Sequence, residues 1–390
     1  MEKELLYREW LKRDLEDNDL NKELKSIEGD INGINDRFYK NLEFGTGGLR
    51  GIIGAGTNRM NIYTVRRATQ GLCDYLNEKY KKPSAAIAFD SRNKSELFAR
   101  EAACVFAANG IKAFIFKELM PTPVLSFTVR HLGCSGGVVI TASHNPAKYN
   151  GYKAYWSDGA QLVPPYDELV IEEVNKIENY ADIKRIGEEE AKAKGLLQII
   201  GKETDDAYIA ALKKLVLDKD VIKKMAKDIR IVYTPFHGTG NVPVRRMLKE
   251  LGFTQVWVVP EQEEPDGNFT TLDYPNPEDP KAFTLALALA KKVDADIVLA
   301  TDPDADRLGV YAKDTATGEY MTFTGNMSGL LICEYELSRK REMGLLPEPR
   351  ENGALVTTIV SSNMAFAIAK EYGITAIEVL TGFKYIGEQI

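Results

Sequence analysis

Short apolar runs alternate with helical stretches through most of the chain, and the same order recurs three times. An apolar run at 85–90 precedes a helical stretch at about 96–109, Gly110 and the apolar run IKAFIF. Later the chain reads IRIVYTPF, VPVRRMLKEL, Gly252 and FTQVWVV, and then ALVTTIV, MAFAIAKEY, Gly373 and ITAIEVL. Each glycine follows its helical stretch where a left-handed residue commonly ends a helix. The pattern predicts an α/β protein of consecutive related βαβ-containing domains, by duplication or by ordinary α/β construction.

The first forty residues carry a different pattern, in which apolar residues recur at spacings of three and four. These residues are Leu20, Leu24, Ile27, Ile31 and Ile34. The spacing predicts a helical stripe, which two glycines weaken. We expect residues 1–40 to form a helical arm on the first domain, and an arm that binds a partner is the alternative. We expect domains at 41–200, 201–318 and 319–390, with candidate boundaries in the charged segment around 180–205 and near 315–320.

Composition excludes several classes of protein. The 390 residues carry a net charge of −7, with 44% apolar and 27% charged residues, which is typical of a globular, mildly acidic chain. A nucleic-acid binder usually shows a basic face, and no apolar run approaches the roughly 18 residues of a membrane helix. The N-terminus has no apolar signal core. Four cysteines without CxxC spacing are typical of reduced thiols, so we expect a cytoplasmic protein.

A glycine-rich segment at 44–61 is the first candidate for chemistry. It contains six glycines, at positions 45, 47, 48, 51, 54 and 56, together with Arg50 and Arg59. Glycines let backbone amides approach an anion, and the arginines add positive charge, so the segment predicts a loop that binds an anion. It matches neither a dinucleotide fingerprint nor a P-loop. A flexible surface turn is the alternative.

The second candidate is a serine at the end of an expected buried strand, where GGVVI leads into the polar run TASHNP. Small neighbours predict an accessible Ser143 hydroxyl. A hydrolase triad fits poorly, because GxSxG is missing and Ser143 and His144 point apart in an extended chain. A serine that accepts a phosphoryl group needs only accessibility, a metal and cations. An ordinary turn is the alternative.

The third candidate is an acidic loop after another expected buried strand, where Asp302, Asp304 and Asp306 precede Arg307. Three carboxylates at alternate positions repel one another unless a cation lies between them. Oxygen ligands favour a hard ion, and we expect Mg²⁺ when a phosphate completes the ligand shell. An EF-hand is excluded because its required glycine and glutamate are missing. A phosphatase with Asp302 as nucleophile stays open, although Asp306 does not fit its DxDx[TV] motif.

Two further loops follow strands of the second and third repeats. Thr381-Gly382-Phe383-Lys384 could present backbone amides and Lys384 to an anion at a helix start. The loop TPFHGTGN at 234–241 is interpreted as structural support, with His237 satisfied internally.

Together these motifs resemble the α-D-phosphohexomutase superfamily, which includes phosphoglucomutases and phosphomannomutases. The sequences FGTGGLRG, TASHNP, DPDADR and TGFK occur in family order between about Phe38 and Ile390. The motifs PDGNF (265–269) and PNPE (275–278) most resemble the bacterial phosphoglucomutase and phosphopentomutase-like branch. The resemblance implies α/β domains with mostly parallel mixed sheets around a central cleft.

The resemblance also implies roles for individual residues. Ser143 is implied to carry the phosphoryl group, and its phosphate to share Mg²⁺ with Asp302, Asp304 and Asp306. Four further positions are implied to contact phosphate or substrate: Arg50, Arg307, Thr381 and Lys384. Lys153 and His144 are the implied candidates for proton transfer with the sugar hydroxyl.

The implied reaction interconverts a hexose 1-phosphate and a hexose 6-phosphate, with glucose 1-phosphate as the first choice. The phosphoryl group of Ser143 passes to the free hydroxyl, and glucose 1,6-bisphosphate is the intermediate and activator. Phosphomannomutase and phosphopentomutase are neighbouring alternatives. An aspartate-nucleophile phosphatase and a fragment that only binds sugar phosphates are alternatives from other classes. We expect small-molecule sugar phosphates as partners, and neither nucleic acid nor membrane.

One departure from the family follows the TGFK motif. The family's sugar-recognition loop and the phosphate clamp of its fourth domain do not occur within these 390 residues. The last residues form an amphipathic stretch in which Phe383, Ile386 and Ile390 share a face. We therefore expect a shortened chain, with the third domain incomplete and the fourth absent.

Overall fold

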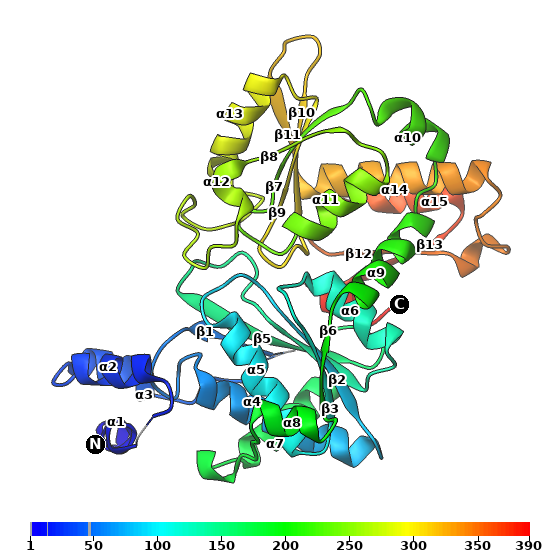
Figure 1. The fold of residues 1–390 in the computed structure, drawn as a ribbon. Coiled ribbons are helices and arrows are strands. Elements are labelled where there is room, and N and C mark those ends of the chain that lie inside the picture. The colour runs from blue at the N-terminus through cyan, green and yellow to red at the C-terminus, as the bar shows by residue number, and fades with distance from the viewer. Residues whose placement is uncertain (1, 14, 46–47) are drawn as a thin grey trace. The chain divides into compact units, whose positions relative to one another are not determined.

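The computed structural model describes residues 2–13, 15–45 and 48–390, and it defines two units (Figure 1). Unit 1 comprises Met1–Thr204 and Asp266–Asn268, and unit 2 comprises Asp205–Pro265 and Phe269–Ile390. Gly47, one of the six glycines of the predicted anion loop, lies outside the described residues.

Unit 1 is built on a six-stranded mixed sheet with the order β1-β5-β4-β2-β3-β6. Its strands are β1 (Gly48–Ile52), β2 (Ser84–Phe89), β3 (Lys112–Phe116), β4 (Gly136–Ile140), β5 (Tyr149–Trp156) and β6 (Leu197–Ile200). Strand β5 is antiparallel to both β1 and β4, whereas β4, β2, β3 and β6 are parallel. The buried apolar runs of the sequence therefore form the parallel part of the sheet, as expected.

Helices cover both faces of this sheet. They are α4 (Ile62–Lys79), α5 (Ser95–Ala108), α6 (Thr122–His131), α7 (Tyr166–Lys176) and α8 (Glu188–Ala193). Successive residues of a strand face opposite sides. A Cβ atom added at Gly136 would meet Leu76 of α4, and one added at the next residue, Gly137, would meet Val129 of α6. Helices α4 and α6 thus pack on opposite faces of β4.

The N-terminal arm forms three helices, α1 (Glu2–Lys12), α2 (Asn18–Ser26) and α3 (Ile31–Phe38). The predicted stripe runs over α2, α3 and the turn between them. Gly29, with a φ of +81°, lies in the turn that separates α2 from α3. Leu20, Leu24, Ile27 and Ile34 are buried, but Ile31 is 73% exposed, because the chain changes direction just before it. The arm contacts the sheet-bearing part of unit 1 through Trp10, whose ring lies 5.5 Å from that of Tyr63 in α4.

Unit 2 contains a five-stranded sheet with the order β11-β10-β9-β7-β8. Its strands are β7 (Arg230–Thr234), β8 (Gln255–Val258), β9 (Ile297–Thr301), β10 (Leu308–Lys313) and β11 (Tyr320–Phe323). Strands β7, β8 and β9 are parallel, and β10 is antiparallel to β9 and β11. Helix α9 (Lys202–Lys214) begins in unit 1 and continues into unit 2. The next α-helices of unit 2 are α10 (Lys219–Met225), α11 (Asn241–Glu250), α12 (Pro260–Glu263) and α13 (Thr284–Val293).

The third repeat lies at the end of unit 2. Its elements are α14 (Gly325–Glu342), β12 (Ala354–Thr358), α15 (Met364–Tyr372), β13 (Thr375–Val379) and α16 (Phe383–Gly387), and the two strands pair in parallel. Gly373 ends α15 with a φ of +70°, as its place after the helical pattern predicts. On the predicted apolar face of the last residues, Phe383 is 79% and Ile390 93% exposed, while Ile386 is half-buried.

The observed architecture confirms the predicted α/β fold with mixed, largely parallel sheets, but it corrects the prediction for the glycine-rich segment. Residues 48–52 form strand β1 instead of a loop. The glycines allow neighbouring strands to approach closely here. A Cβ atom at Gly48 would clash, because it would lie 1.9 Å from the Tyr152 carbonyl oxygen. A pattern of glycines carries no apolar alternation, so the strand could not be recognised from it.

Two predictions from composition can be compared with the structure. No helix within residues 2–13, 15–45 and 48–390 is both long and apolar enough to cross a membrane. The four cysteines are free thiols, as their spacing predicted: Cys73, Cys104 and Cys134 are buried, and Cys333 is partly exposed.

Gly151 of β5 provides a test of the sheet that carries the candidate site. A Cβ atom there would lie 2.4 Å from the Thr141 carbonyl oxygen and 2.9 Å from that of Leu49. We expect Gly151→Ala to lower the free energy of unfolding by about 1–3 kcal/mol, because β1 and β4 must move apart. Gly187→Ala is the control, since no atom lies within 4 Å of its Cβ position. Equal urea midpoints for the two variants would contradict the prediction.

Candidate functional site

Ser143 lies in the loop that joins β4 to β5. Its φ is +51°, a left-handed conformation that is uncommon for a residue with a side chain. The Ser143 backbone N–H donates to the Thr141 hydroxyl oxygen at 2.8 Å, which holds the turn at its start. The residue is 4% exposed, whereas its small neighbours predicted an accessible hydroxyl. The serine nevertheless follows directly from a buried strand, as predicted.

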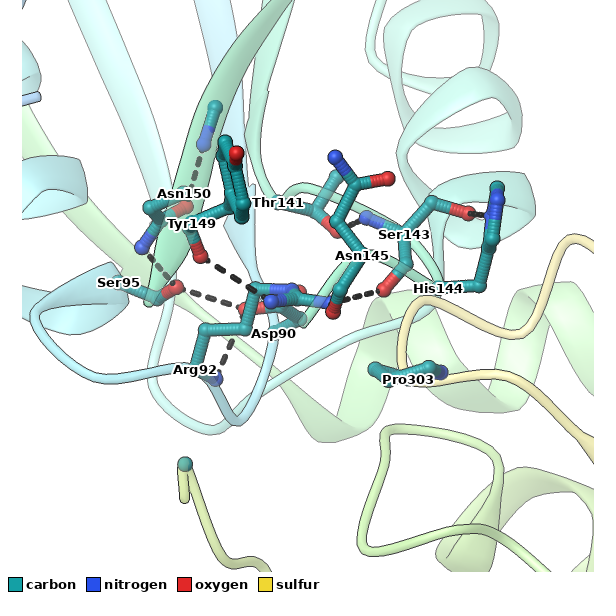
Figure 2. A network of polar contacts seen from close by, with 12 residues as sticks. Asp90, Arg92, Ser95, Thr141, Ser143, His144, Asn145, Tyr149, Asn150 and Pro303 are labelled. Atoms are coloured by element: carbon teal, nitrogen blue, oxygen red, sulfur yellow. Dashed lines mark hydrogen bonds and ion pairs between the residues drawn. The ribbon is translucent and has the colours of Figure 1, made fainter. Parts of the chain in front are cut away.

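The Ser143 and His144 side chains lie together, and the expectation that they point apart was wrong. Ser143 Oγ and His144 Nδ1 are 3.3 Å apart, within hydrogen-bond distance (Figure 2). The expectation assumed an extended chain, in which neighbouring side chains alternate. The left-handed backbone of Ser143 removes that alternation. His144 is therefore placed where it could exchange a proton with the serine hydroxyl.

Arg92 binds the same loop from the turn after β2 (Figure 2), and sequence reasoning missed this residue. Its guanidinium donates hydrogen bonds to four backbone carbonyl oxygens, those of Ser143, Asn145, Pro146 and Tyr149. The last two bonds are each 3.1 Å long. The only signal in the sequence was a polar turn, Asp90-Ser91-Arg92, at the end of a buried strand.

Asp90 fixes Arg92 at the carboxyl end of β2. Its Oδ1 accepts the Arg92 backbone N–H at 2.9 Å and the Ser95 hydroxyl at 2.7 Å, and its Oδ2 lies 3.4 Å from Arg92 Nε. Both side chains are fully buried. Burial raises the pKa of the Asp90 carboxyl, although the Arg92 charge and hydrogen bonds from Ser95 and Thr141 act in the opposite direction. The pair thus holds the Arg92 guanidinium beside the serine loop.

Asn150, the second residue of β5, extends this support. Its side-chain amide donates to the Ser95 hydroxyl oxygen at 2.9 Å and to the Asn93 carbonyl at 3.0 Å. Asn150 is completely buried. The turn after β2 is therefore bound to both ends of the serine loop, to Ser143 through Arg92 and to the start of β5 through Asn150.

Arg50 and Lys153 lie on the antiparallel edge of the same sheet. Arg50 pairs with Gly151 across β1 and β5, and Lys153 is two residues further along β5, so register places both on one face. Arg50 is exposed and Lys153 half-buried. The other arginine of the glycine-rich segment, Arg59, is buried and forms an ion pair with Asp36 of α3. Arg59 therefore has a structural role in place of the predicted anion contact.

The acidic loop of unit 2 follows β9 directly, as predicted. Ligand oxygens of Asp302, Asp304 and Asp306 all lie within 4.8 Å of one another, and the first two residues are buried. Asp302 Oδ1 accepts the Arg307 backbone N–H at 3.0 Å, which closes the loop. Three carboxylates at this spacing form an all-oxygen donor set that fits a hard divalent cation such as Mg²⁺.

The 234–241 loop supports the acidic loop, which confirms its structural interpretation. The backbone N–H and the hydroxyl of Thr239 both donate to the Pro303 carbonyl oxygen at 2.8 Å. Gly238 packs so closely that a Cβ atom would lie 2.4 Å from Pro303 Cα. His237 is satisfied internally, as predicted, with the Glu264 carbonyl and the Thr271 hydroxyl each 2.9 Å from a ring nitrogen.

The remaining candidate residues lie elsewhere in unit 2. Arg307 lines an open cavity of about 610 Å³ together with Phe323 and Asn326. Thr381 is exposed after β13, and Lys384 Nζ lies 4.5 Å from the centre of the Tyr385 ring. The structure thus brings Ser143, His144, Lys153 and Arg50 onto unit 1, and the acidic loop, Arg307, Thr381 and Lys384 onto unit 2.

Comparison with known proteins identifies the family of the chain. Three family models match the chain: phosphoglucomutase/phosphomannomutase alpha/beta/alpha domain I over residues 41–181, domain II over 206–317 and domain III over 324–390. The chain belongs to the phosphoglucomutase/phosphomannomutase family, within the α-D-phosphohexomutase superfamily. The three matched segments contain all the candidate residues named above.

Individual relatives differ in the names they carry. A phosphoglucomutase of Staphylococcus saprophyticus is 39% identical over 349 residues, which cover 90% of this chain and 61% of the relative. A phosphopentomutase of Mus musculus is 37% identical over 363 residues, covering 90% and 58%. The chain therefore spans about three fifths of the length of these relatives.

A solved structure gives a further comparison. A phosphoglucomutase/phosphomannomutase family protein of Burkholderia thailandensis matches with a TM-score of 0.65 and 21% identity, over 89% of this chain and 68% of that one. At this identity the match shows the fold alone. It agrees with the mixed α/β architecture described above.

The acidic loop can be tested by the response of the chain to Mg²⁺. We expect Mg²⁺ to raise the temperature of thermal unfolding by a few degrees, because an ion at a hundred times its Kd adds about 2.7 kcal/mol of stability. Asp302→Asn should remove most of this response. Asp273→Asn, which changes an exposed carboxylate outside the cluster, should keep it. An unchanged response in Asp302→Asn would contradict a metal site.

Proposed function

We propose that this protein is a phosphosugar mutase that interconverts a hexose 1-phosphate and a hexose 6-phosphate through a phosphorylated Ser143. One observation carries the proposal: the serine loop and the acidic loop are both built at carboxyl ends of buried strands, in a chain of this family. Ligands of open α/β sheets bind at such ends.

The proposed reaction consists of two phosphoryl transfers, one from Ser143 to the sugar and one from the sugar back to Ser143. In the first, the bond between Ser143 Oγ and phosphorus breaks while the free sugar hydroxyl forms a bond to the same phosphorus. The proton of that hydroxyl passes to a base, for which His144 and Lys153 are the candidates. The bisphosphate then turns over, and its other phosphoryl group returns to Ser143 Oγ as the proton is given back. Glucose 1,6-bisphosphate is both the intermediate and the activator of a chain that has lost its phosphate.

Charge neutralisation is the main requirement of phosphoryl transfer. We assign this role to Arg50 and Arg307, and substrate contact in the third repeat to Thr381 and Lys384. Asp302, Asp304 and Asp306 would hold Mg²⁺ together with the phosphate on Ser143. When bound, the ion would neutralise charge on the phosphoryl oxygens.

These roles assign a function to each of the predicted domains. We propose an arm at 1–40, a phosphoserine domain at 41–200, a metal-binding domain at 201–318 and a partial sugar-binding domain at 319–390. The three family matches support this division. A cytoplasmic location stays a prediction from the cysteine pattern.

Phosphoryl transfer to Ser143 is tested by incubation with glucose 1,6-bisphosphate and Mg²⁺, followed by intact-mass and peptide analysis. We expect one phosphate on the Ser143 peptide of the 390-residue chain and none in Ser143→Ala. Ser135→Ala is the matched control, because Ser135 directly precedes the opposite end of β4. A wild-type chain that gains no phosphate would overturn the proposal.

The same variant separates a mutase from a phosphatase. If Asp302 were the nucleophile of a phosphatase, Ser143→Ala would still release inorganic phosphate from glucose 1-phosphate. The mutase proposal predicts loss of all transfer in this variant, by a factor of at least about 10³, since the carrier atom is gone. Inorganic phosphate and glucose 6-phosphate should be measured in the same samples.

Pentose phosphates are the second candidate substrates, because a phosphopentomutase relative is almost as similar as a phosphoglucomutase. We expect kcat/KM to be higher for glucose 1-phosphate than for ribose 1-phosphate or mannose 1-phosphate. A difference of tenfold corresponds to about 1.4 kcal/mol in the transition state. A preference for ribose 1-phosphate would assign the chain to pentose metabolism and leave the role of Ser143 unchanged.

A further inference from the structure

Arg92 is a buried charged group beside the serine loop that the proposed reaction leaves unused. The side chain is fully buried, and its partner Asp90 is equally buried. The four carbonyl groups that it binds belong to residues 143, 145, 146 and 149, which span the segment from Ser143 to the first residue of β5. One side chain therefore organises the entire segment that presents Ser143 (Figure 2).

The loop needs such a centre for two physical reasons. Its carbonyl groups turn inward, and buried acceptors without a donor each cost about 1–3 kcal/mol. In addition, the left-handed backbone of Ser143 is unfavourable by roughly 1–2 kcal/mol. A planar guanidinium with five N–H donors can serve several carbonyls at fixed angles, whereas a lysine ammonium has three donors at a single point.

The backbone of Ser143 is consequently held on both sides. Its N–H is bound by the Thr141 hydroxyl, and its carbonyl is bound by Arg92. These two bonds fix the peptide planes before and after the Cα atom. The direction of the Cα–Cβ bond, and so the region that Oγ can reach, follows from them.

We propose that Arg92 is a positioning residue for phosphoryl transfer, which acts by fixing the left-handed backbone of Ser143 and so the direction of Oγ. The proposal rests on the proposed function, because it concerns the geometry of the same carrier serine. An in-line transfer is sensitive to such geometry, and a displacement of about 1 Å can cost 10²-fold in rate. Arg92 binds the backbone of the carrier Ser143 and is not proposed to contact the sugar.

The test compares Arg92→Lys with wild type in phosphoryl transfer from glucose 1,6-bisphosphate to Ser143. Lysine keeps the positive charge but cannot span the four carbonyls. We expect the transfer rate to fall about 10- to 100-fold, while the concentration of bisphosphate that gives half the maximal rate stays within about twofold. A loss of binding alone would show the reverse pattern and overturn the proposal.

Arg66→Lys is the matched control. Arg66 is also a buried arginine of unit 1, and its guanidinium donates to Glu16 and Glu101 instead of the serine loop. We expect this variant to lose stability but to phosphorylate Ser143 at the wild-type rate in the folded fraction. An equal loss of transfer in both lysine variants would show a general effect of destabilisation and overturn the positioning role.

Two further measurements test the proposal independently of the transfer rate of Arg92→Lys. Guanidinium chloride at millimolar concentration should restore transfer in Arg92→Ala, because it refills the site of the lost group. Amide hydrogen exchange should be at least tenfold faster at residues 142–149 in Arg92→Lys and unchanged in α4. Unchanged exchange in that loop would overturn the proposal.

The outcomes for wild type and variant separate this inference from the proposed function. If wild-type protein gains no phosphate at Ser143, the mutase proposal fails, and the role of Arg92 fails with it. If wild type is phosphorylated and Arg92→Lys is phosphorylated at the same rate, only the role of Arg92 fails.

Discussion

The pairing of two parallel strands, β2 and β4, is the constraint on which the serine site depends. Their register aligns Phe89 with Ile140, and the Asp90 N–H donates to the Ile140 carbonyl at 3.1 Å. Both strands therefore end at the same edge of the sheet, and the turns that follow them meet. Arg92 reaches the carbonyl groups around Ser143 only because of this alignment. Helix packing on both faces keeps the strands in place, so the core positions the site indirectly.

Unit 2 uses the same construction with different chemistry. Strands β7 and β9 are parallel neighbours, and the loop after β7 binds the acidic loop after β9. Here the contacts are neutral, from Thr239 to the Pro303 carbonyl and from Gly238 by close packing. A buried cation beside the three carboxylates would compete with a metal ion for their oxygens. A buried cation beside the serine loop instead attracts the phosphate that Ser143 is proposed to carry. The two supports thus suit the charges that the two loops are proposed to carry.

The sequence predicted the features that depend on local pattern. Buried strands, the glycines that end helices and the acidic loop at the end of β9 all have signatures within about ten residues. The role of Arg92 has none, because its contacts join positions more than fifty residues apart. Strand β1 was missed because it is pinned by glycines against β5 instead of by apolar alternation. The contact between Ser143 and His144 depends on the positive φ angle of Ser143, which no pattern of residues predicts.

The order in which unit 1 is completed during synthesis follows from its topology. Strand β1, which carries Arg50, pairs only with β5, so Gly48 leaves the ribosome long before its partner Lys153. Non-local pairing of this kind is slow to form. Asn93 also donates to Asn268, which belongs to unit 1 although the chain has already entered unit 2. A nascent chain therefore carries β1 without its partner strand until β5 has been made, and an unpaired strand edge is prone to wrong pairing.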